Sequence, residues 1–122
     1  MICCPTAAEL RVALERFDTM DDGDGRRVFL ARVADNARAL LAREATLGAA
    51  AQAAEQARLT ALLGVEGDVE TLNQRLCDAL TSGTLAPRDP AVLAHLRASA
   101  IDRIAIDQPA YCGLEALMAT RA

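Results

Sequence analysis

The chain contains no Trp and no Lys, and one Tyr and two Phe are its only aromatic residues. Runs of β-branched and aromatic residues, from which strands are usually built, are therefore scarce. Ala and Leu supply most of the 52% of residues that are hydrophobic. Both are strong helix formers, so the composition favours close-packed helices over a sheet.

Arg supplies every fixed positive charge, and the formal net charge is -4. Acidic and basic residues are interspersed, and no basic patch stands free of carboxylates. Because a nucleic-acid interface needs such a patch, we predict no nucleic-acid partner.

Long apolar stretches are also missing, and the longest is too short to span a bilayer. The first five residues, Met1-Ile2-Cys3-Cys4-Pro5, lack the basic and apolar regions of a signal peptide. We therefore expect a cytoplasmic protein with reduced thiols and no membrane partner.

The four Cys and the single His show no metal-ligand spacing, because no CxxC motif occurs. The acidic stretch from Asp18 to Gly25 could be a calcium loop. However, an EF-hand register on Asp22 and Asp24 places Met20 at the first ligand position and Ala31 at the bidentate one. Neither residue is suitable, so we predict no metal site and no cofactor.

Apolar residues recur at helical spacing along most of the chain. With 122 residues, the length favours one domain over residues 1–122. The predicted fold is all-α, a compact antiparallel bundle of about five helices plus a short C-terminal helix. The helices are expected at residues 6–19, 26–47, 49–63, 68–82 and 90–107, followed by a tail at 111–122.

Local signals place several of these helix ends. Thr6 and Glu9 fit a capping box, and Asp89-Pro90 fits an N-cap followed by Pro at the first helical position. Gly48 separates the second and third predicted helices. A kinked continuation is the alternative there, but we favour a short turn to an antiparallel neighbour.

The helix at 26–47 is predicted to be the centre of the bundle. Its buried stripe is expected to contain Phe29, Val33, Leu40 and Leu47. In the helix at 90–107, the expected buried face contains Leu93, Leu96, Ala100, Ile101 and Ile104.

Each of these two faces includes a charged residue, Glu44 in the first and Arg97 in the second. A buried charge needs a partner, so we expect the two to meet, with Asn36 or Asn73 completing the hydrogen bonds. The pair would fix helix register. Alternatively, Arg97 lines a cleft and receives an anionic ligand, or the side chains extend to solvent.

His95, Ser99 and Asp102 lie on one face of the helix at 90–107, at spacings i, i+4 and i+7. This order suggests a catalytic triad, but three side chains on one straight helix do not have triad geometry. We predict a solvated or interface face and no catalytic residues.

Three segments resemble a known family: PTAAEL, RVFLARVADNARALLARE and HLRASAIDRIAIDQPAY. They are similar to a bacterial domain-of-unknown-function family of small all-helical proteins. Its members are often encoded beside aminoglycoside-phosphotransferase-like kinases and acyl-CoA dehydrogenases. The resemblance covers Pro5 to Tyr111, although Leu30 stands where a His is expected. It implies an accessory subunit for a kinase-like protein, with acyl-CoA metabolism as a setting.

The favoured function is therefore a non-catalytic accessory or protein-interaction module that partners a phosphotransferase-like protein. The apolar side chains of the C-terminal tail could also mediate homo-oligomerisation. The alternative is a helical bundle that binds a small anionic ligand, with Arg97 as anchor and Glu44 and Asn36 as polar lining. An enzyme is the least favoured class.

Overall fold

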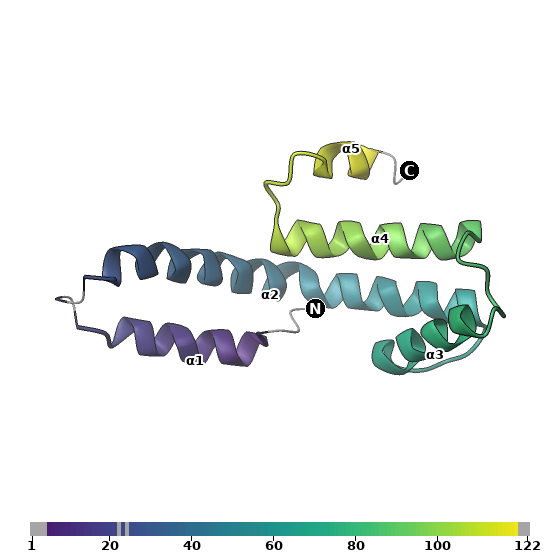
Figure 1. Cartoon of the computed structure of the whole chain (residues 1–122), viewed down its shortest axis with the longest axis horizontal. Coiled ribbons are helices and arrows are strands. Elements are labelled where there is room, and N and C mark those ends of the chain that lie inside the picture. The colour runs from purple at the N-terminus through teal and green to yellow at the C-terminus, as the bar shows by residue number, and fades with distance from the viewer. Residues whose placement is uncertain (1–4, 22, 24, 120–122) are drawn as a thin grey trace. The chain divides into compact units, whose positions relative to one another are not determined.

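The computed structural model describes residues 5–21, 23 and 25–119, and these form five helices and no strand. The helices are α1 (Ala7–Asp18), α2 (Arg27–Leu63), α3 (Val69–Thr81), α4 (Pro90–Asp107) and α5 (Leu114–Ala119) (Figure 1). The all-α prediction is confirmed. The tail does form a short helix, but the main helices number one fewer than expected.

The missing helix end is the one predicted at Gly48. α2 continues through this residue for a total of 37 residues, so the predicted turn is wrong. One glycine inside a helix costs about 1 kcal/mol relative to Ala. Ending one helix and starting another leaves eight backbone groups in need of partners, four carbonyls and four N–H groups. Because alanines follow Gly48 and no Pro or polar turn residue does, continuing the helix is the cheaper outcome.

The other helix ends follow their local signals. Thr6 and Glu9 form the predicted capping box on α1. The Asp68 carboxylate accepts from the Thr71 backbone N–H at the start of α3, and the Asp89 carboxylate accepts from the Ala91 N–H at the start of α4. These hydrogen bonds satisfy backbone donors that a helix start leaves open.

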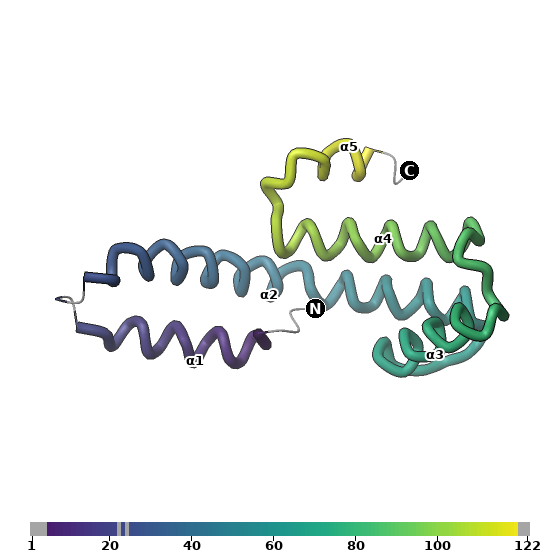
Figure 2. Tube along the Cα trace, viewed as in Figure 1, coloured from purple at the N-terminus to yellow at the C-terminus, as the bar shows by residue number. Residues whose placement is uncertain are grey.

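The chain divides into two compact units, Met1–Gly48 and Ala49–Ala122, and α2 runs through both. In the first unit the chain reverses direction between α1 and α2, so the two helices are antiparallel (Figure 2). The second unit contains the rest of α2 with α3, α4 and α5. That residues 1–122 form one domain stays a prediction.

The second unit has the larger apolar core. Leu59 of α2 and Leu72 and Leu76 of α3 form a buried cluster, and their exposed fractions are 0%, 0% and 4%. Val92, Ile101 and Ile106 of α4 are also buried. Interdigitated Leu side chains of this kind supply most of the stability of a small helical domain.

The first unit buries very little. α1 has no buried residue, and Ala34 is the one buried hydrophobic side chain among the described residues of this unit. The predicted stripe of α2 is wrong for Phe29, Val33 and Leu47, whose exposed fractions are 70%, 48% and 41%. The more buried line includes Ala34 and Leu41, so α2 turns a neighbouring face toward α1.

The predicted face of α4 also needs correction. Leu93 and Leu96 are 51% and 47% exposed, whereas Ile101 is buried as predicted. The buried face of α4 instead includes Val92 and His95. None of the described helices is both long enough and apolar enough to cross a membrane.

Candidate functional site

A cluster of charged residues joins α2 to α4 inside the second unit. Arg58 Nη2 of α2 donates to Ser99 Oγ and to Asp102 Oδ2 of α4, at 3.2 Å in both cases. The side chains of Arg58 and Asp102 are only 24% and 10% exposed. Two contacts from one nitrogen hold the guanidinium in a fixed orientation between the helices.

α2 also contributes a carboxylate to this cluster, on the same side as Arg58 and one turn before it. Glu55 is 5% exposed, and its Oε1 accepts a hydrogen bond from Asn73 Nδ2 of α3 at 3.1 Å. Arg103 Nη2 of α4 lies 3.9 Å from the same oxygen. Glu55 therefore connects three helices, and its burial is compensated by one hydrogen bond and one ion pair.

His95 completes this polar cluster from α4. Its side chain is 4% exposed, and Nδ1 is buried with no hydrogen-bond partner among the described residues. Desolvation lowers the pKa of the imidazole, and the positive charge of Arg58 lowers it further, while Glu55 acts in the opposite direction. The neutral imidazole is therefore the favoured form.

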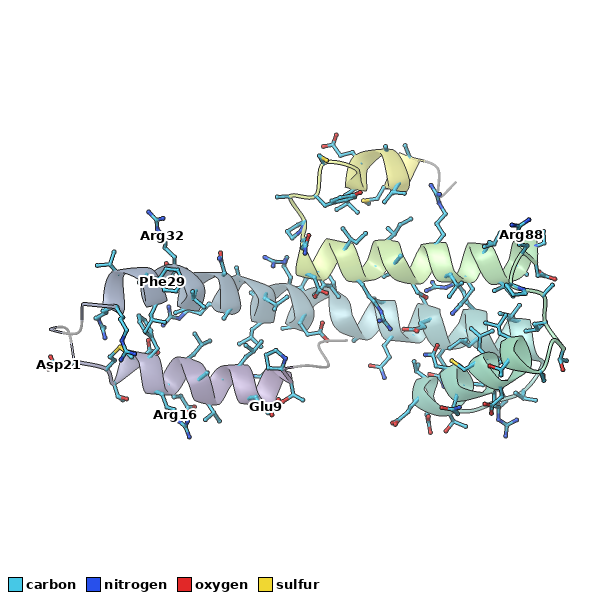
Figure 3. The ribbon with its side chains drawn as sticks, viewed as in Figure 1. Glu9, Arg16, Asp21, Phe29, Arg32 and Arg88 are labelled. Atoms are coloured by element: carbon cyan, nitrogen blue, oxygen red, sulfur yellow. The ribbon has the colours of Figure 1, made fainter. Side chains whose placement is uncertain are left out.

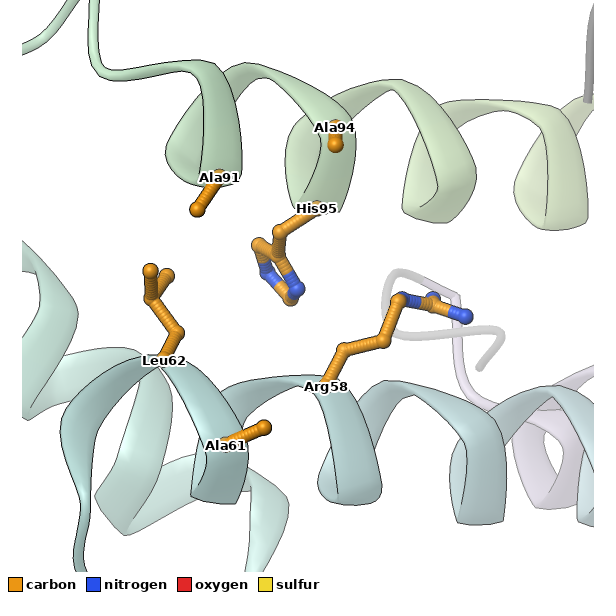
Figure 4. Close-up of a pocket in the computed structure, with 6 residues that line it drawn as sticks. All are labelled: Arg58, Ala61, Leu62, Ala91, Ala94 and His95. Carbon is orange, nitrogen blue, oxygen red and sulfur yellow. The ribbon is translucent and has the colours of Figure 1, made fainter.

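A cavity of about 320 Å³ lies beside this imidazole, between α2 and α4. Figure 4 shows His95 and Ala91 pointing from α4 toward α2, and Leu62 pointing from α2 toward α4. The remaining lining residues are Arg58, Ala61 and Ala94. Apart from Arg58 and His95, the residues that line this cavity are apolar.

These contacts correct the prediction for His95, Ser99 and Asp102. Their face is neither solvated nor open to a partner, because it packs against α2. Ser99 and Asp102 bind Arg58 and not His95, so the three side chains do not form a proton relay.

The residues predicted to bind a ligand lie in both units. Arg97 of α4 and Asn36 of α2 are exposed, and Glu44 of α2 is partly buried. The predicted burial of Arg97 within an apolar face is therefore wrong. The pairing of Arg97 with Glu44 and a ligand site formed with Asn36 stay predictions. Asn73 was the other candidate for the pair, and its amide binds Glu55.

The first unit contains a different feature, an apolar groove of about 260 Å³ between α1 and α2. Its lining includes Leu10, Leu14 and Phe17 from α1 and Leu30, Val33 and Ala37 from α2. Arg16 is the charged residue in this lining. We call this feature the α1–α2 groove.

Two arginines of α2 fix the position of α1 beside this groove. The Arg27 guanidinium stacks over the Phe17 ring at 5.0 Å, and its Nη1 donates to the Met20 carbonyl at 2.6 Å. Arg38 pairs with Asp18 at the end of α1. These contacts hold the two helices together where apolar burial is small.

Two predicted features lie wholly or partly outside the described residues. Asp22 and Asp24 of the acidic loop are not among them, so the prediction that the loop binds no calcium stays a prediction. In the tail, Leu114 is buried whereas Tyr111 and Met118 are 48% and 52% exposed. Homo-oligomerisation through this tail also stays a prediction.

Residues 21–111 match the model of the family described as Domain of unknown function (DUF6285). The chain belongs to this family. The matched residues include α2, α3 and α4 and leave out α1 and α5. They begin later than the resemblance at Pro5, so the PTAAEL segment lies outside the match. No curated protein and no solved structure is significantly similar to the chain.

Sequence reasoning missed Glu55 and Arg58, although a signal for them existed. Both share a helical stripe with Leu59 and Leu62, at spacings of three and four residues. A charge within an apolar stripe needs a buried partner. The rule that selected Glu44 and Arg97, that a charge in an apolar stripe needs a partner, therefore applied equally to Glu55 and Arg58.

Proposed function

We propose that this protein is a non-catalytic accessory module that holds an apolar helix of a partner protein in the α1–α2 groove. The observation that carries the proposal is the lack of burial in the first unit. Phe29 and Val28 are 70% and 79% exposed, and α1 buries no residue. Helices of this kind need a further apolar surface to cover them.

An amphipathic helix is the occupant that suits the groove. The lining residues Leu10, Leu14 and Phe17 recur at helical spacing on α1, and Leu30, Val33 and Ala37 do so on α2. A third helix laid between two antiparallel helices completes a small helical core. Phe29 lies one turn before Val33 and extends the apolar surface beyond the groove.

Charge gives a further requirement for the partner. Arg16 contributes to the lining of the groove, so the docked helix is expected to place an acidic residue against it. Arg32 points away from α1 and so is not available to that helix in the groove (Figure 3). The partner that the family resemblance implies is a phosphotransferase-like protein, and we propose it as the source of the helix.

The test measures binding of a purified phosphotransferase-like protein by isothermal titration calorimetry, with two matched variants of this chain. Val33 and Val12 have the same exposed fraction, 48%, but only Val33 lines the groove. Val33→Glu is expected to weaken the complex at least tenfold, because it places a carboxylate in the apolar lining. Val12→Glu should change the affinity by less than about threefold.

Three outcomes would contradict the proposal. The first is that no complex forms at micromolar concentrations. The second is that both Val variants bind equally well. The third is self-association that Val33→Glu abolishes, measured by light scattering, because the groove would then hold a second copy of this chain.

A further inference from the structure

Two arginines of α2 reach the same aromatic ring on α1. The guanidinium carbon of Arg27 lies 5.0 Å from the centre of the Phe17 ring, and that of Arg38 lies 5.9 Å from it. Arg27 and Arg38 are about three helical turns apart on α2. The residues that α2 contributes to the α1–α2 groove all lie between them in sequence, namely Leu30, Val33, Ala34 and Ala37. The two arginines therefore bracket the part of α2 that lines the groove.

The same arginines bind polar groups at the C-terminal end of α1. Arg27 Nη1 donates to the Phe17 carbonyl at 3.3 Å and to the Met20 carbonyl at 2.6 Å. Carbonyls at a helix end lack partners within the helix, and a cation there also interacts favourably with the helix dipole. Arg38 Nη2 donates to the Asp18 carboxylate. We call these contacts of Arg27 and Arg38 with Phe17, Asp18 and Met20 the α1 clamp.

Apolar burial contributes little to the attachment of α1. None of its residues is buried, and Ala34 is the one buried hydrophobic side chain among the described residues of the first unit. α1 has 12 residues, and a helix of that length is marginally stable in water on its own. The Arg38 and Asp18 side chains are 43% and 58% exposed, and contacts between exposed charges are individually weak. α1 is therefore attached by electrostatic contacts that can be broken without disrupting a core.

We propose that the α1 clamp is reversible and controls the formation of the α1–α2 groove. While the clamp is closed, α1 is helical and lies against α2. When the clamp opens, α1 detaches and loses its helix, whereas the buried cluster of Leu59, Leu72 and Leu76 keeps the second unit folded. Because α1 supplies one wall of the groove, an open clamp leaves no groove. The consequence for docking rests on the proposed function, but the opening of the clamp is a property of the free chain.

The test follows the ring signals of the full-length protein by NMR, without a partner, after labelling of phenylalanine with ¹³C. The chain has two Phe residues. Phe17 reports on the clamp, and Phe29, which is 70% exposed, is the internal reference. An increase from about 0.05 to 1 M NaCl screens exposed charges but does not weaken apolar contacts. It is expected to move the Phe17 signals at least halfway to their positions in urea, while the Phe29 signals stay in place.

Two further signals show whether the opening is local. Circular dichroism should lose helix content in parallel with the shift of Phe17, because detached α1 is too short to stay helical. The imidazole signals of His95, the single His of the chain, report on the second unit and should not change. A change of the His95 signals together with those of Phe17 would mean global unfolding and would overturn the proposal.

Two matched variants test the role of Arg27. Arg27→Gln should shift the Phe17 signals at low salt as 1 M NaCl does in the wild type. Arg32→Gln removes the same charge from the same helix, but Arg32 points away from α1 (Figure 3), so it should leave these signals unchanged. The proposal is overturned if neither salt nor Arg27→Gln moves the Phe17 signals, or if Arg32→Gln moves them equally. If Arg27→Gln does not fold, the salt titration of the wild type decides.

Binding of the phosphotransferase-like protein separates this inference from the proposed function. Arg27→Gln should weaken the complex at least tenfold, and Arg32→Gln should change its affinity by less than about threefold. A clamp that opens as expected in the free protein, together with full binding by Arg27→Gln, would place docking outside the groove. That result would contradict the proposed function and the role of the clamp in docking.

Discussion

Arg58 Nη2 and Asp102 Oδ2 lie 3.2 Å apart and link α2 to α4 through side chains that are mostly buried. The sequence predicted an opposite-charge pair between the second and last long segments, and named Arg97 and Glu44. That pair stays a prediction. The buried pair observed here joins α4 to the part of α2 that was predicted as a separate helix at 49–63, with the cation on α2 and the anion on α4. Ser99 accepts a hydrogen bond from the same nitrogen and further fixes the register of α4 against α2.

The Arg58–Asp102 pair should be measurable by a double-mutant cycle. Arg58→Ala is expected to lower the free energy of unfolding by about 2 kcal/mol or more, because a mostly buried carboxylate loses its guanidinium. The coupling energy with Asp102→Ala should be at least about 1 kcal/mol. Urea denaturation of the four proteins measures both quantities.

The exposed Arg38–Asp35 pair provides the control for this cycle. Its side chains are 43% and 76% exposed, so its coupling energy should stay below about 0.5 kcal/mol. Equal coupling in the two cycles would show that burial does not strengthen the Arg58 pair.

Asn73 is expected to stabilise the protein through Glu55 of α2. Asn73→Ala removes the hydrogen bond to a carboxylate that is 5% exposed, which should cost about 1–3 kcal/mol of unfolding free energy. Asn73→Asp should cost more, because it places a second carboxylate against the first. Thermal and urea denaturation measure both variants.

Gln74, the next residue of α3, is the reference for this substitution. Its amide binds the exposed Asp78 side chain, so Gln74→Ala should change the unfolding free energy by less than about 0.5 kcal/mol. A comparable loss in Asn73→Ala and Gln74→Ala would mean that the Glu55 contact contributes nothing specific.

The sequence predicts the helices and most of their ends because those features depend on nearby residues. Thr6 with Glu9 and Asp89 with Pro90 are complete signals within a few residues. Gly48 is an incomplete signal, because a glycine ends a helix only when the following residues favour a turn. In this chain alanines follow, and the helix continues.

The buried faces depend on distant residues and were harder to predict. Phe29 and Leu93 belong to stripes that look buried, yet they are 70% and 51% exposed. In helices rich in Ala and Leu, apolar residues occupy most of the circumference, so the apolar stripe alone does not show which face of the helix is buried. His95 was predicted on a solvated or interface face, although it is 4% exposed.

Substitutions at Gly48 test whether α2 is continuous. Gly48→Pro should destabilise the protein by about 3 kcal/mol or more, because Pro removes a helical hydrogen bond and clashes with the preceding turn. In a turn, the same substitution would be far less costly. Circular dichroism during thermal unfolding measures the loss of both stability and helix content.

Gly48→Ala completes this test. A Cβ at this position would lie 2.8 Å from Glu44 Oε1, at the flexible end of that side chain. Movement of Glu44 offsets part of the gain of about 1 kcal/mol that Ala brings to a helix. Ala should therefore be tolerated while Pro is not, and tolerance of both would contradict a continuous helix.

The burial of His95 should make stability depend on pH near neutrality. Desolvation and Arg58 lower the pKa of the folded imidazole below its ordinary value, so between the folded and unfolded pKa values the unfolded chain binds more protons. Stability therefore rises with pH across that interval and falls as pH decreases from 7 through about 6.5. For one titrating group, the unfolding free energy changes by at most about 1.4 kcal/mol per pH unit.

Urea denaturation between pH 5.5 and 7.5 measures this slope, because carboxylates titrate mainly below that range. His95→Gln keeps a polar side chain but removes the titration, so its stability should be nearly constant over the interval. NMR titration of the single imidazole should independently give a pKa below its ordinary value. A wild-type slope that matches that of His95→Gln, or stability that increases on acidification, would show that the folded state does not disfavour the protonated imidazole.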